Sequence, residues 1–433
     1  MSGLGRFVAD RTGRVVAATL IGPVLALAPM IGDSAAAAVP MDLTEDCAPA
    51  DPGNVFDGTP WPQEQTDLRS AWRFAEEGKG VQIAVIDTGF LPQHPQLQDI
   101  TSAEYPAATF ITVGEVQNTS LTPFNDCVGH GTEVTSVIAA QFSDEVEFVG
   151  VAPYVDIIPI RVQYNEDIGA KNADIASAIH HAVDVGADII NVSLETTQDN
   201  DQLREAVARA GEEGVLIVAA AGNNGSRPAY PARYAGEFPH VISVGAVDRR
   251  GVIMGGDANP TSGTSSNTTL VAPGVEVPVA TGTGGYAIVN GTSYAAPFVS
   301  GVAALVLNVF PDLEPAQVRR RLEITAEHAG YDLPDKRYGW GMVNPVAAVT
   351  AVLPEDLDNL NKDVQKFAPK PVAPLPPDDG DPTMRNRALA AAGGACGLAI
   401  VAIAVAFVYR RGHARQWKPG LPESPAPDEL RTS

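Results

Sequence analysis

The sequence predicts an α/β domain with a mostly parallel central sheet, followed by one C-terminal transmembrane helix. Short runs rich in Val and Ile alternate with helical patterns along residues 81–352, and the runs are apolar at both odd and even positions, as in parallel strands buried on both faces. This alternation favours a parallel sheet with helices on both sides. Farther along, residues 388–409 form an uncharged apolar run of 22 residues, long enough to cross the ~30 Å hydrocarbon core of a membrane.

The elements of the domain follow in order along the chain. The predicted strands are Val81–Ile86, Ile157–Val162, Asp188–Val192, Val215–Ala221 and Val241–Val247. The predicted helices are 172–185, 200–213, Ser293–Phe310 and Pro315–Ala329. Residues 99–126 show no sustained period, and we expect a loop there. We place the whole domain at residues 76–353.

The N-terminus has the three parts of a secretory signal peptide. Arg6, Arg11 and Arg14 form a basic segment, and an apolar run and a group of small residues follow it. We therefore predict a cleaved signal peptide over residues 1–38; the alternative is an uncleaved anchor helix. Residues 39–75 are predicted to be an N-terminal extension that lies on the domain.

The C-terminal part predicts a membrane anchor. Residues 354–387 are rich in Pro and Asp and indicate a semi-rigid linker. Arg410 and Arg411 follow the apolar run 388–409, and basic residues favour the cytoplasmic side. We expect a single-pass protein of the cell membrane whose domain lies outside the cytoplasm and whose tail, residues 410–433, lies inside. The alternative for the apolar run is a buried core helix.

The charge of the chain argues against one class of partner. Lys and Arg total 29 against 52 Asp and Glu, which gives a net charge of −23 at pH 7. Proteins that bind nucleic acid need basic surfaces, so we expect no nucleic-acid partner. The acidic surface suits either solubility outside the cell or electrostatic steering of a substrate.

The chain has three cysteines, and one of them, Cys396, lies in the predicted span. Cys47 and Cys127 lie in the predicted exterior part, where disulfides persist. We predict a Cys47–Cys127 disulfide; the alternative is two free thiols. Because Cys127 comes three residues before His130, this bond would hold the N-terminal extension beside that histidine.

Two motifs place a carboxylate and an imidazole near turns. Asp87, in Val-Ile-Asp-Thr-Gly, ends a predicted strand, and sites in open α/β sheets form at the carboxyl ends of strands. His130 lies between two glycines that leave its ring uncovered. Taken alone, Asp87 fits a turn or helix cap, and His130 fits a structural residue or a metal ligand. The nearby Glu133 lies on the wrong helix face for a shared metal, and no other metal-binding residue has suitable spacing.

Two further motifs supply a hydroxyl and an amide. Ser293, in Gly-Thr-Ser-Tyr-Ala-Ala-Pro, opens a long apolar helix among small residues, which leave room for a substrate carbonyl. Taken alone, it fits an N-cap, but a helix N-terminus also stabilises an oxyanion. Asn223, in Ala-Gly-Asn-Asn-Gly, follows a predicted strand, and its amide suits an oxyanion; the alternative is a Gly-Asn turn.

The four motifs together predict nucleophilic catalysis. A serine hydroxyl needs a base to take its proton, and His supplies that base near neutral pH. A buried carboxylate fixes the tautomer of the His and stabilises the imidazolium. The chain order Asp87, His130, Ser293 is one of the known orders of such triads.

These motifs resemble those of the subtilisin-like (subtilase) serine proteases, over about residues 81–350. The resemblance implies a subtilisin-like three-layer fold and an endopeptidase that acts on proteins or peptides. It implies that Asp87 orients His130, that His130 is general base and acid, and that Ser293 is the nucleophile. Asn223 and the backbone N–H of Ser293 would form the oxyanion hole.

The same resemblance identifies a specificity pocket and two departures from the family. Ser193 and Leu194 resemble the segment that binds substrate, but Glu195 stands where the family usually has Gly, which suggests a pocket for a basic or small side chain. Glu133 stands where many relatives have His. No calcium-loop pattern occurs between residues 87 and 130, so we expect no obligatory metal and no cofactor. The stretch before the domain is too short for the full pro-domain of many subtilases.

The order of segments resembles one branch of the family, the mycosins of actinobacterial type VII secretion. That resemblance implies assembly with the secretion complex at the outer face of the membrane, and processing of secreted substrates. The main alternative is a scaffolding subunit of that complex with incidental protease activity. A released, nutritional protease is disfavoured by the predicted anchor.

Overall fold

The computed structural model describes ten ranges of the chain: 53–113, 116–118, 121–163, 170–223, 229–254, 268–282, 284–328, 333–354, 405–414 and residue 416. The predicted signal peptide, Cys47 and the predicted linker after residue 354 lie outside these ranges. So does most of the predicted span 388–409.

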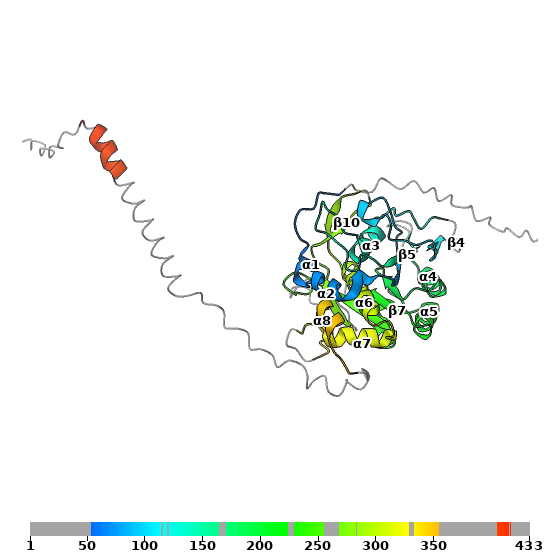
Figure 1. Cartoon of the computed structure of the whole chain (residues 1–433). Helices are drawn as coiled ribbons and strands as arrows, with labels where there is room; N and C mark the ends of the chain where they lie inside the picture. The colour runs from blue at the N-terminus through cyan, green and yellow to red at the C-terminus, as the bar shows by residue number, and fades with distance from the viewer. Residues whose placement is uncertain are drawn as a thin grey trace, which may run out of the picture. The chain divides into compact units, whose positions relative to one another are not determined.

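A seven-stranded sheet forms the centre of the domain, in the order β2-β5-β1-β6-β7-β8-β9 (Figure 1). All neighbouring strands in it run parallel. The strands are β1 (Gln82–Asp87), β2 (Ala108–Thr109), β5 (Asp156–Arg161), β6 (Ile189–Val192), β7 (Leu216–Ala220), β8 (Val241–Val247) and β9 (Leu270–Pro273). The predicted parallel sheet is confirmed, and the five predicted strands match observed ones to within a residue or so at each end.

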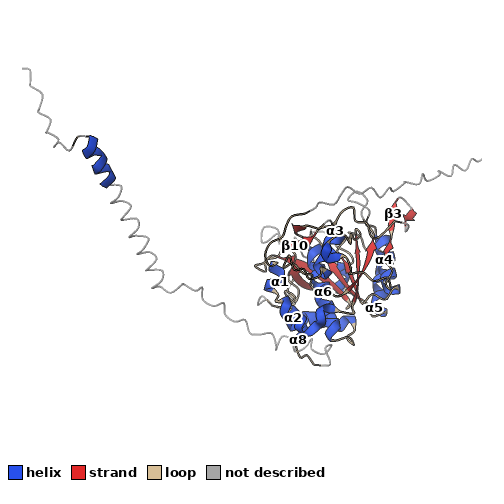
Figure 2. Ribbon diagram, turned by 45° about the horizontal axis from the view of Figure 1, so that its top comes forward, coloured by secondary structure: helices blue, strands red, loops and turns tan. Residues whose placement is uncertain are grey.

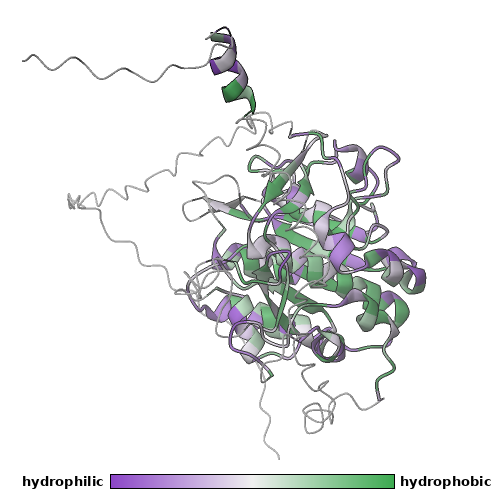
Figure 3. Ribbon diagram, turned by 90° about the vertical axis from the view of Figure 1, so that its left-hand side faces the viewer, coloured by the Kyte–Doolittle hydropathy of each residue, from purple (hydrophilic) through white to green (hydrophobic). Residues whose placement is uncertain are grey.

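Helices cover both faces of this sheet, which gives the predicted three-layer fold (Figure 2). Alternate residues of β1 enter different cores. Ile83 and Val85 belong to the cluster that contains α3 (His130–Ala139) and α6 (Thr292–Val309), whereas Ala84 and Ile86 belong to the cluster that contains α4 (Asn172–Asp184) and α5 (Asp201–Glu212). Figure 3 shows hydrophobic residues concentrated in the central strands. The long helices are α3 (His130–Ala139), α4 (Asn172–Asp184), α5 (Asp201–Glu212), α6 (Thr292–Val309) and α7 (Pro315–Thr325).

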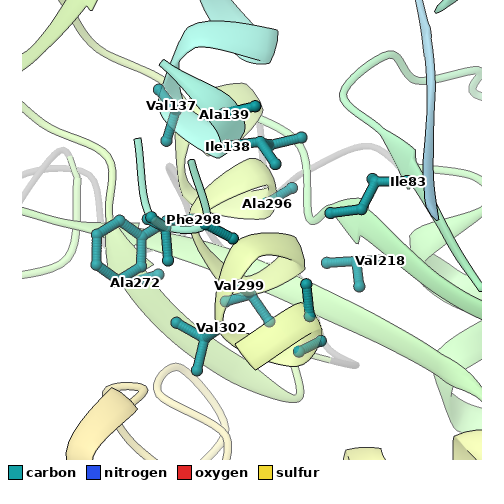
Figure 4. Packing of buried hydrophobic residues seen from close by; sticks show 14 of the residues in the cluster. Ile83, Val137, Ile138, Ala139, Val218, Ala272, Ala296, Phe298, Val299 and Val302 are labelled. Carbon is teal, nitrogen blue, oxygen red and sulfur yellow. The ribbon is translucent and has the colours of Figure 1, made fainter. Parts of the chain in front are cut away.

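Helix α6 runs through the core. Its residues Ala296, Val299 and Val302 lie among side chains of α3 and of the sheet, including Ile138 and Val218 (Figure 4). Within the described residues, α6 is the helix whose length and composition would suit a membrane span, but 78% of it is buried in the protein. We therefore assign it as a core helix. The apolar side chains of Val405, Phe407 and Tyr409, at the end of the predicted span, lie in a short helical segment and are each about 60% exposed.

Three segments differ from the sequence predictions. Short helices α1 (Trp61–Gln65) and α2 (Leu68–Ala75) lie in the predicted extension. Helix α2 was not predicted, although its buried residues Leu68, Ala71, Trp72 and Ala75 recur at the spacing of one helix face. Strand β2 and the hairpin of β3 (Ile111–Val113) and β4 (Val116–Asn118) lie in the predicted loop 99–126. Helix α7 ends at Thr325 rather than at Ala329.

The remaining elements complete the described part of the domain. They are the 3-10 helices η1 (Glu76–Gly78), η2 (Pro95–Leu97) and η3 (Ala232–Gly236), the hairpin of β10 (Val277–Ala280) and β11 (Tyr286–Val289), and helix α8 (Pro345–Thr350). Helix α2 packs against α6 and α8, and its residues Leu68, Ala71 and Trp72 are buried. The predicted extension therefore contributes to the hydrophobic core.

Candidate active site

The predicted site residues converge at the carboxyl ends of the central strands. A pocket of about 330 Å³ opens there. Its wall is formed by Thr88, Val128, His130, Gln163, Ser193, Leu194, Glu195, Ala220, Asn223, Thr292 and Ser293. Residues from six separate segments of the chain thus share one cavity, as the strand-end rule for open sheets predicts.

Asp87 and His130 form a close pair behind this pocket. His130 Nδ1 lies 2.7 Å from Asp87 Oδ1. The Asp87 side chain is 1% exposed, whereas 21% of the His130 side chain is exposed. The carboxylate therefore fixes a proton on Nδ1, which leaves Nε2 as the ring nitrogen that can accept one.

Burial and nearby carboxylates act on the pKa of His130 in opposite directions. Burial has the largest single effect and lowers the pKa of His130, but the charge and hydrogen bond of Asp87, together with the charges of Glu133 and Asp126, outweigh it and raise this pKa to about 9.

The two glycines beside these residues allow the pair to form. A Cβ atom on Gly131 would lie 2.2 Å from the carbonyl oxygen of Gly89 and 3.1 Å from Asp87 Cβ. Any larger residue at position 131 would push the start of α3 away from the end of β1. Of the two glycines that flank His130, Gly131 therefore permits the close approach of α3 to β1.

Asp126 is a site residue that the sequence analysis missed. It is 2% exposed, and its Oδ2 accepts hydrogen bonds of 2.8 Å from the backbone N–H and the hydroxyl of Thr132. Its Oδ1 accepts from Thr88 Oγ1 and from the Gly129 N–H, and Thr88 Oγ1 accepts from the Gly131 N–H. This network holds the first turn of α3 against β1. An acidic residue just before a helix start was the signal for it.

Ser293 lies in the first turn of α6, and its backbone is held by Ser193. Pro297 has no N–H, so the carbonyl of Ser293 lacks its usual partner four residues along the helix. Ser193 Oγ donates a hydrogen bond of 2.8 Å to that carbonyl instead. Ser193 in turn accepts a bond of 3.0 Å from Asn191 Nδ2. The predicted substrate-binding residue Ser193 therefore also fixes the position of Ser293.

Ser293 and His130 share the pocket wall. Among the hydrogen bonds of the described residues there is none between Ser293 Oγ and His130 Nε2. Such bonds are often long in structures without substrate and shorten when substrate binds.

The orientation of Asn223 is set by the helix that carries Ser293. Asn223 Oδ1 accepts hydrogen bonds from the Thr292 N–H at 2.9 Å and from Thr292 Oγ1 at 3.1 Å. Because a backbone N–H can only donate, the oxygen of the amide must face Thr292. The Nδ2 group is then the donor edge of an amide that lines the pocket.

Glu195 lies at the rim of the pocket, next to Gly222. A Cβ atom on Gly222 would lie 2.5 Å from Glu195 Oε2, so the glycine leaves room for this carboxylate. Glu195 is exposed, while Leu194 is partly buried. The three residues that the sequence assigned to substrate binding, Ser193 to Glu195, all line the pocket.

Cys127 is disulfide-bonded, and Cys47, its predicted partner, lies outside the described residues. Within the described ranges, no group of three or more His, Cys, Asp or Glu side chains is placed to hold a metal ion.

Comparison with known proteins identifies the family. A sequence profile of the subtilase family (peptidase S8) matches residues 78–341. The chain belongs to the subtilase family. Subtilisin DY of Bacillus licheniformis is 37% identical to it over 279 residues, which cover 63% of this chain and 92% of that protein. This subtilase is accordingly a serine endopeptidase.

Its structural neighbours include the mycosins. The MycP3 protease from the type VII (ESX-3) secretion system is 33% identical, with a TM-score of 0.56 over 71% of this chain and 91% of that chain. MycP1 from Mycobacterium smegmatis is 27% identical, with a TM-score of 0.58 over 71% of this chain and 89% of that chain.

The raised pKa of His130 predicts an alkaline protease. In the general-base role that the sequence predicts for His130, the ring must be neutral to accept a proton, and a pKa of about 9 keeps most imidazole rings protonated at pH 7. We expect kcat/KM to rise with pH through a midpoint near 9. The measurement is a pH profile of peptide hydrolysis between pH 6 and pH 10 at constant ionic strength. A midpoint below 7 would contradict this electrostatic account of the Asp87–His130 pair.

Proposed function

We propose that this subtilase is a membrane-anchored, extracytoplasmic endopeptidase that uses Asp87, His130 and Ser293 as a catalytic triad. One observation carries the proposal: the buried Asp87 carboxylate bonds the His130 ring at 2.7 Å, in the wall of the pocket that also contains Ser293. A carboxylate, an imidazole and a serine in this arrangement are the parts needed for acyl transfer.

The residues act in a fixed sequence. Ser293 Oγ attacks the carbonyl carbon of the scissile peptide bond while His130 Nε2 takes its proton, and Asp87 stabilises the resulting imidazolium. His130 then gives the proton to the leaving amine, which departs and leaves an acyl-enzyme. Water then attacks the acyl carbon while His130 takes its proton; as the acyl–oxygen bond breaks, His130 returns that proton to Ser293 Oγ and the product acid departs. The Asn223 amide and the Ser293 N–H stabilise the oxyanion in both steps.

Asn223 is expected to contribute to kcat more than to substrate binding. Replacing Asn223 by Ala removes a donor that acts on the oxyanion and not on the ground-state carbonyl, so kcat should fall by about 10²–10³, the loss measured for the equivalent group of a subtilisin. KM should change little. Steady-state kinetics on a peptide substrate measure both. A rise in KM with unchanged kcat would instead make Asn223 a substrate-binding residue.

The segment Ser193 to Glu195 supports a proposal about specificity. Glu195 is a carboxylate at the rim of a pocket whose other lining residues are neutral apart from His130. A basic side chain of the substrate, in the residue before the scissile bond, would bind more tightly because of this negative charge. A small side chain would fit the pocket without contacting Glu195.

Mapping the products of an unfolded protein tests both the activity and this specificity. Incubation of the full-length chain with denatured casein should produce new internal termini, and these should follow basic or small residues. Trimming from the ends alone would contradict an endopeptidase. Cleavage mainly after large apolar residues would contradict the role given to Glu195.

The mycosin neighbours support a role in type VII secretion. One MycP1 structure is described as that of an essential component of the type VII (ESX-1) secretion system. We infer that this chain serves a system of the same type, held by a single span at residues 388–409 with residues 410–433 in the cytoplasm. A deletion strain complemented with Ser293→Ala separates the two roles. Restored secretion would favour the scaffolding alternative, and failed secretion at normal protein levels would favour proteolysis.

We also propose that Cys47 is the disulfide partner of Cys127, which holds residues near the N-terminus beside the His130 helix. The support is that Cys127 is disulfide-bonded and that Cys47 is the other cysteine of the predicted exterior part. Peptide mass mapping of unreduced protein should give one linked Cys47–Cys127 peptide that reduction separates. Recovery of Cys47 as a free thiol would refute the pairing.

A further inference from the structure

A second carboxylate, that of Glu133, lies beside the proposed base and is held by the residue after the proposed nucleophile. Glu133 lies three residues after His130 on α3, which places both side chains on one side of the helix. Tyr294, next to Ser293 on α6, donates a hydrogen bond of 2.6 Å from its hydroxyl to Glu133 Oε2. The proposed mechanism uses neither side chain.

The Tyr294 ring also contacts the imidazole. The centroids of the Tyr294 and His130 rings lie 5.5 Å apart, with 57° between the ring planes. Aromatic rings at this separation attract each other and resist reorientation. Tyr294 is 7% exposed, so its position is fixed by the surrounding core. One phenol therefore touches His130 through its ring and Glu133 through its hydroxyl.

The carboxylate needs this partner. Burial raises the pKa of Glu133, whereas the hydrogen bond from Tyr294 and the charge of His130 lower it. Without the phenol, ionised Glu133 would lose its charge-stabilising donor in a partly buried place. The phenol itself stays neutral, because burial and the charge of Glu133 raise the pKa of Tyr294 far above its usual range.

The groups that act on the imidazole from neighbouring elements are all acidic. They are Asp87 at the end of β1, Asp126 before α3 and Glu133 on α3, and each of them favours the protonated ring. Tyr294 is the titratable residue that faces His130 from α6. Asp87 and Asp126 are already engaged, the first by His130 and Thr88 and the second by the backbone of α3. Glu133 differs from them because its position is set by Tyr294, a residue of α6, the helix that also carries Ser293.

We propose that Glu133 and Tyr294 are positioning residues: the Tyr294 hydroxyl holds the Glu133 carboxylate near His130, and the pair sets the ring's orientation and the pH at which the ring becomes a base. This inference rests on the proposed role of His130 as general base. It links the helix that carries Ser293 to the protonation of His130 on α3.

Two substitutions probe the pair from its two sides. Glu133→Gln keeps the shape and a hydrogen-bond acceptor for Tyr294 but removes the charge, so His130 should lose its proton at lower pH. Tyr294→Phe keeps the ring contact with His130 but removes the hydroxyl, so the carboxylate is no longer held. In the double variant the charge of Glu133 is already absent. Loss of the Tyr294 hydroxyl should then have no further effect on the pH at which His130 is half protonated.

The control is a carboxylate at the opposite end of β1. Asp188 is also subject to burial that raises its pKa, and it accepts a hydrogen bond of 2.9 Å from the N–H of Gln82, where β1 begins. Asp188→Asn changes the net charge by the same amount as Glu133→Gln but lies far from His130 along the strand.

The experiment follows His130 itself as well as activity. The full chain, in detergent, is modified with diethyl pyrocarbonate at a series of pH values, and peptide mass mapping gives the rate of modification of His130. This rate follows the fraction of neutral imidazole, because only the neutral ring reacts. The Ser293→Ala background makes this readout independent of catalysis. The second readout is the pH profile of kcat/KM with Ser293 present.

The proposal predicts that Glu133→Gln moves both midpoints to lower pH by at least about half a unit, in the range that one neighbouring charge produces. Tyr294→Phe should move them in the same direction by less, and the double variant should match Glu133→Gln. Profiles that coincide with those of Asp188→Asn would overturn the proposal, as would a loss of rate without any change in midpoint. If the wild type shows no activity dependent on Ser293 while the His130 midpoint still moves, the proposed function fails and the pair's effect on His130 stands.

Discussion

Replacing Ser293 by Ala is expected to lower kcat for peptide hydrolysis by about 10⁶, the loss found when the nucleophile of a subtilisin is removed. Ser293 lies in the first turn of α6, in a pocket shared with His130 and Asn223. Among the hydroxyl-bearing residues that line this pocket, Thr292 is the other one at the start of α6, and its hydroxyl is already bonded to Asn223. Steady-state kinetics with a chromogenic peptide measure the loss.

A matched variant sharpens this prediction. Because the triad acts as a unit, His130→Ala should cost about as much as Ser293→Ala, and the double variant should be little worse than either. Independent, additive losses would contradict a shared step. A Ser293→Ala protein that keeps a tenth of the wild-type rate would mean that another group performs the attack.

Replacing Asp87 by Asn is expected to lower kcat by about 10⁴, as it does when the buried carboxylate of such a triad is made neutral. The carboxylate accepts hydrogen bonds from the Thr88 N–H at 2.8 Å and from His130 Nδ1 at 2.7 Å, both at Oδ1. An amide in this place can present its NH₂ group to the ring, which favours the tautomer with the proton on Nε2, where no proton can be accepted. The pKa of His130 should also fall, because the largest raising influence is gone.

The Asp87→Asn protein should remain folded, since the substitution conserves shape within the buried site. Circular dichroism and the thermal unfolding midpoint provide the check. Asp126→Asn is the contrasting variant: it disturbs the hydrogen bonds that hold the start of α3, so its effect should appear in stability as well as in rate. A folded Asp87→Asn enzyme of normal kcat would exclude the orienting role given to Asp87.

The parallel sheet was predictable from the sequence because its strands are buried on both faces. The run Val81–Ile86 shows no alternation, and in the structure its residues Ile83 and Ala84 enter different cores. Such a run can be recognised without knowledge of its neighbours. The places of two candidate site residues were predictable for a related reason: Asp87 ends β1 and Asn223 comes shortly after β7, so their positions depend on local structure.

Features that depend on contacts between distant segments were not predictable. Helix α1 has five residues, too few to show a period. The apolar residues of α2 do follow a helical spacing, and what the sequence could not show is the burial of that face against α6 and α8. The predicted placement of Glu133 on the wrong helix face is incorrect, because Glu133 lies three residues after His130 on the same side of α3. The contact with Tyr294 of α6 depends on the packing of two helices that are distant in the sequence. Ser193 also holds the backbone of Ser293, because Pro297 has no N–H to donate to the Ser293 carbonyl and Ser193 Oγ donates to it instead. This contact exists only because α6 packs beside the end of β6.

The central claim is that Ser293 is a nucleophile activated by His130, and covalent labelling tests it most directly. The full-length protein is treated with a fluorophosphonate probe, and the adduct is located by peptide mass mapping, beside Ser293→Ala and His130→Ala as controls. We predict one adduct, on Ser293, formed by the wild type and by neither variant. A wild-type protein that is folded but unlabelled, or an adduct on another residue, would contradict the account.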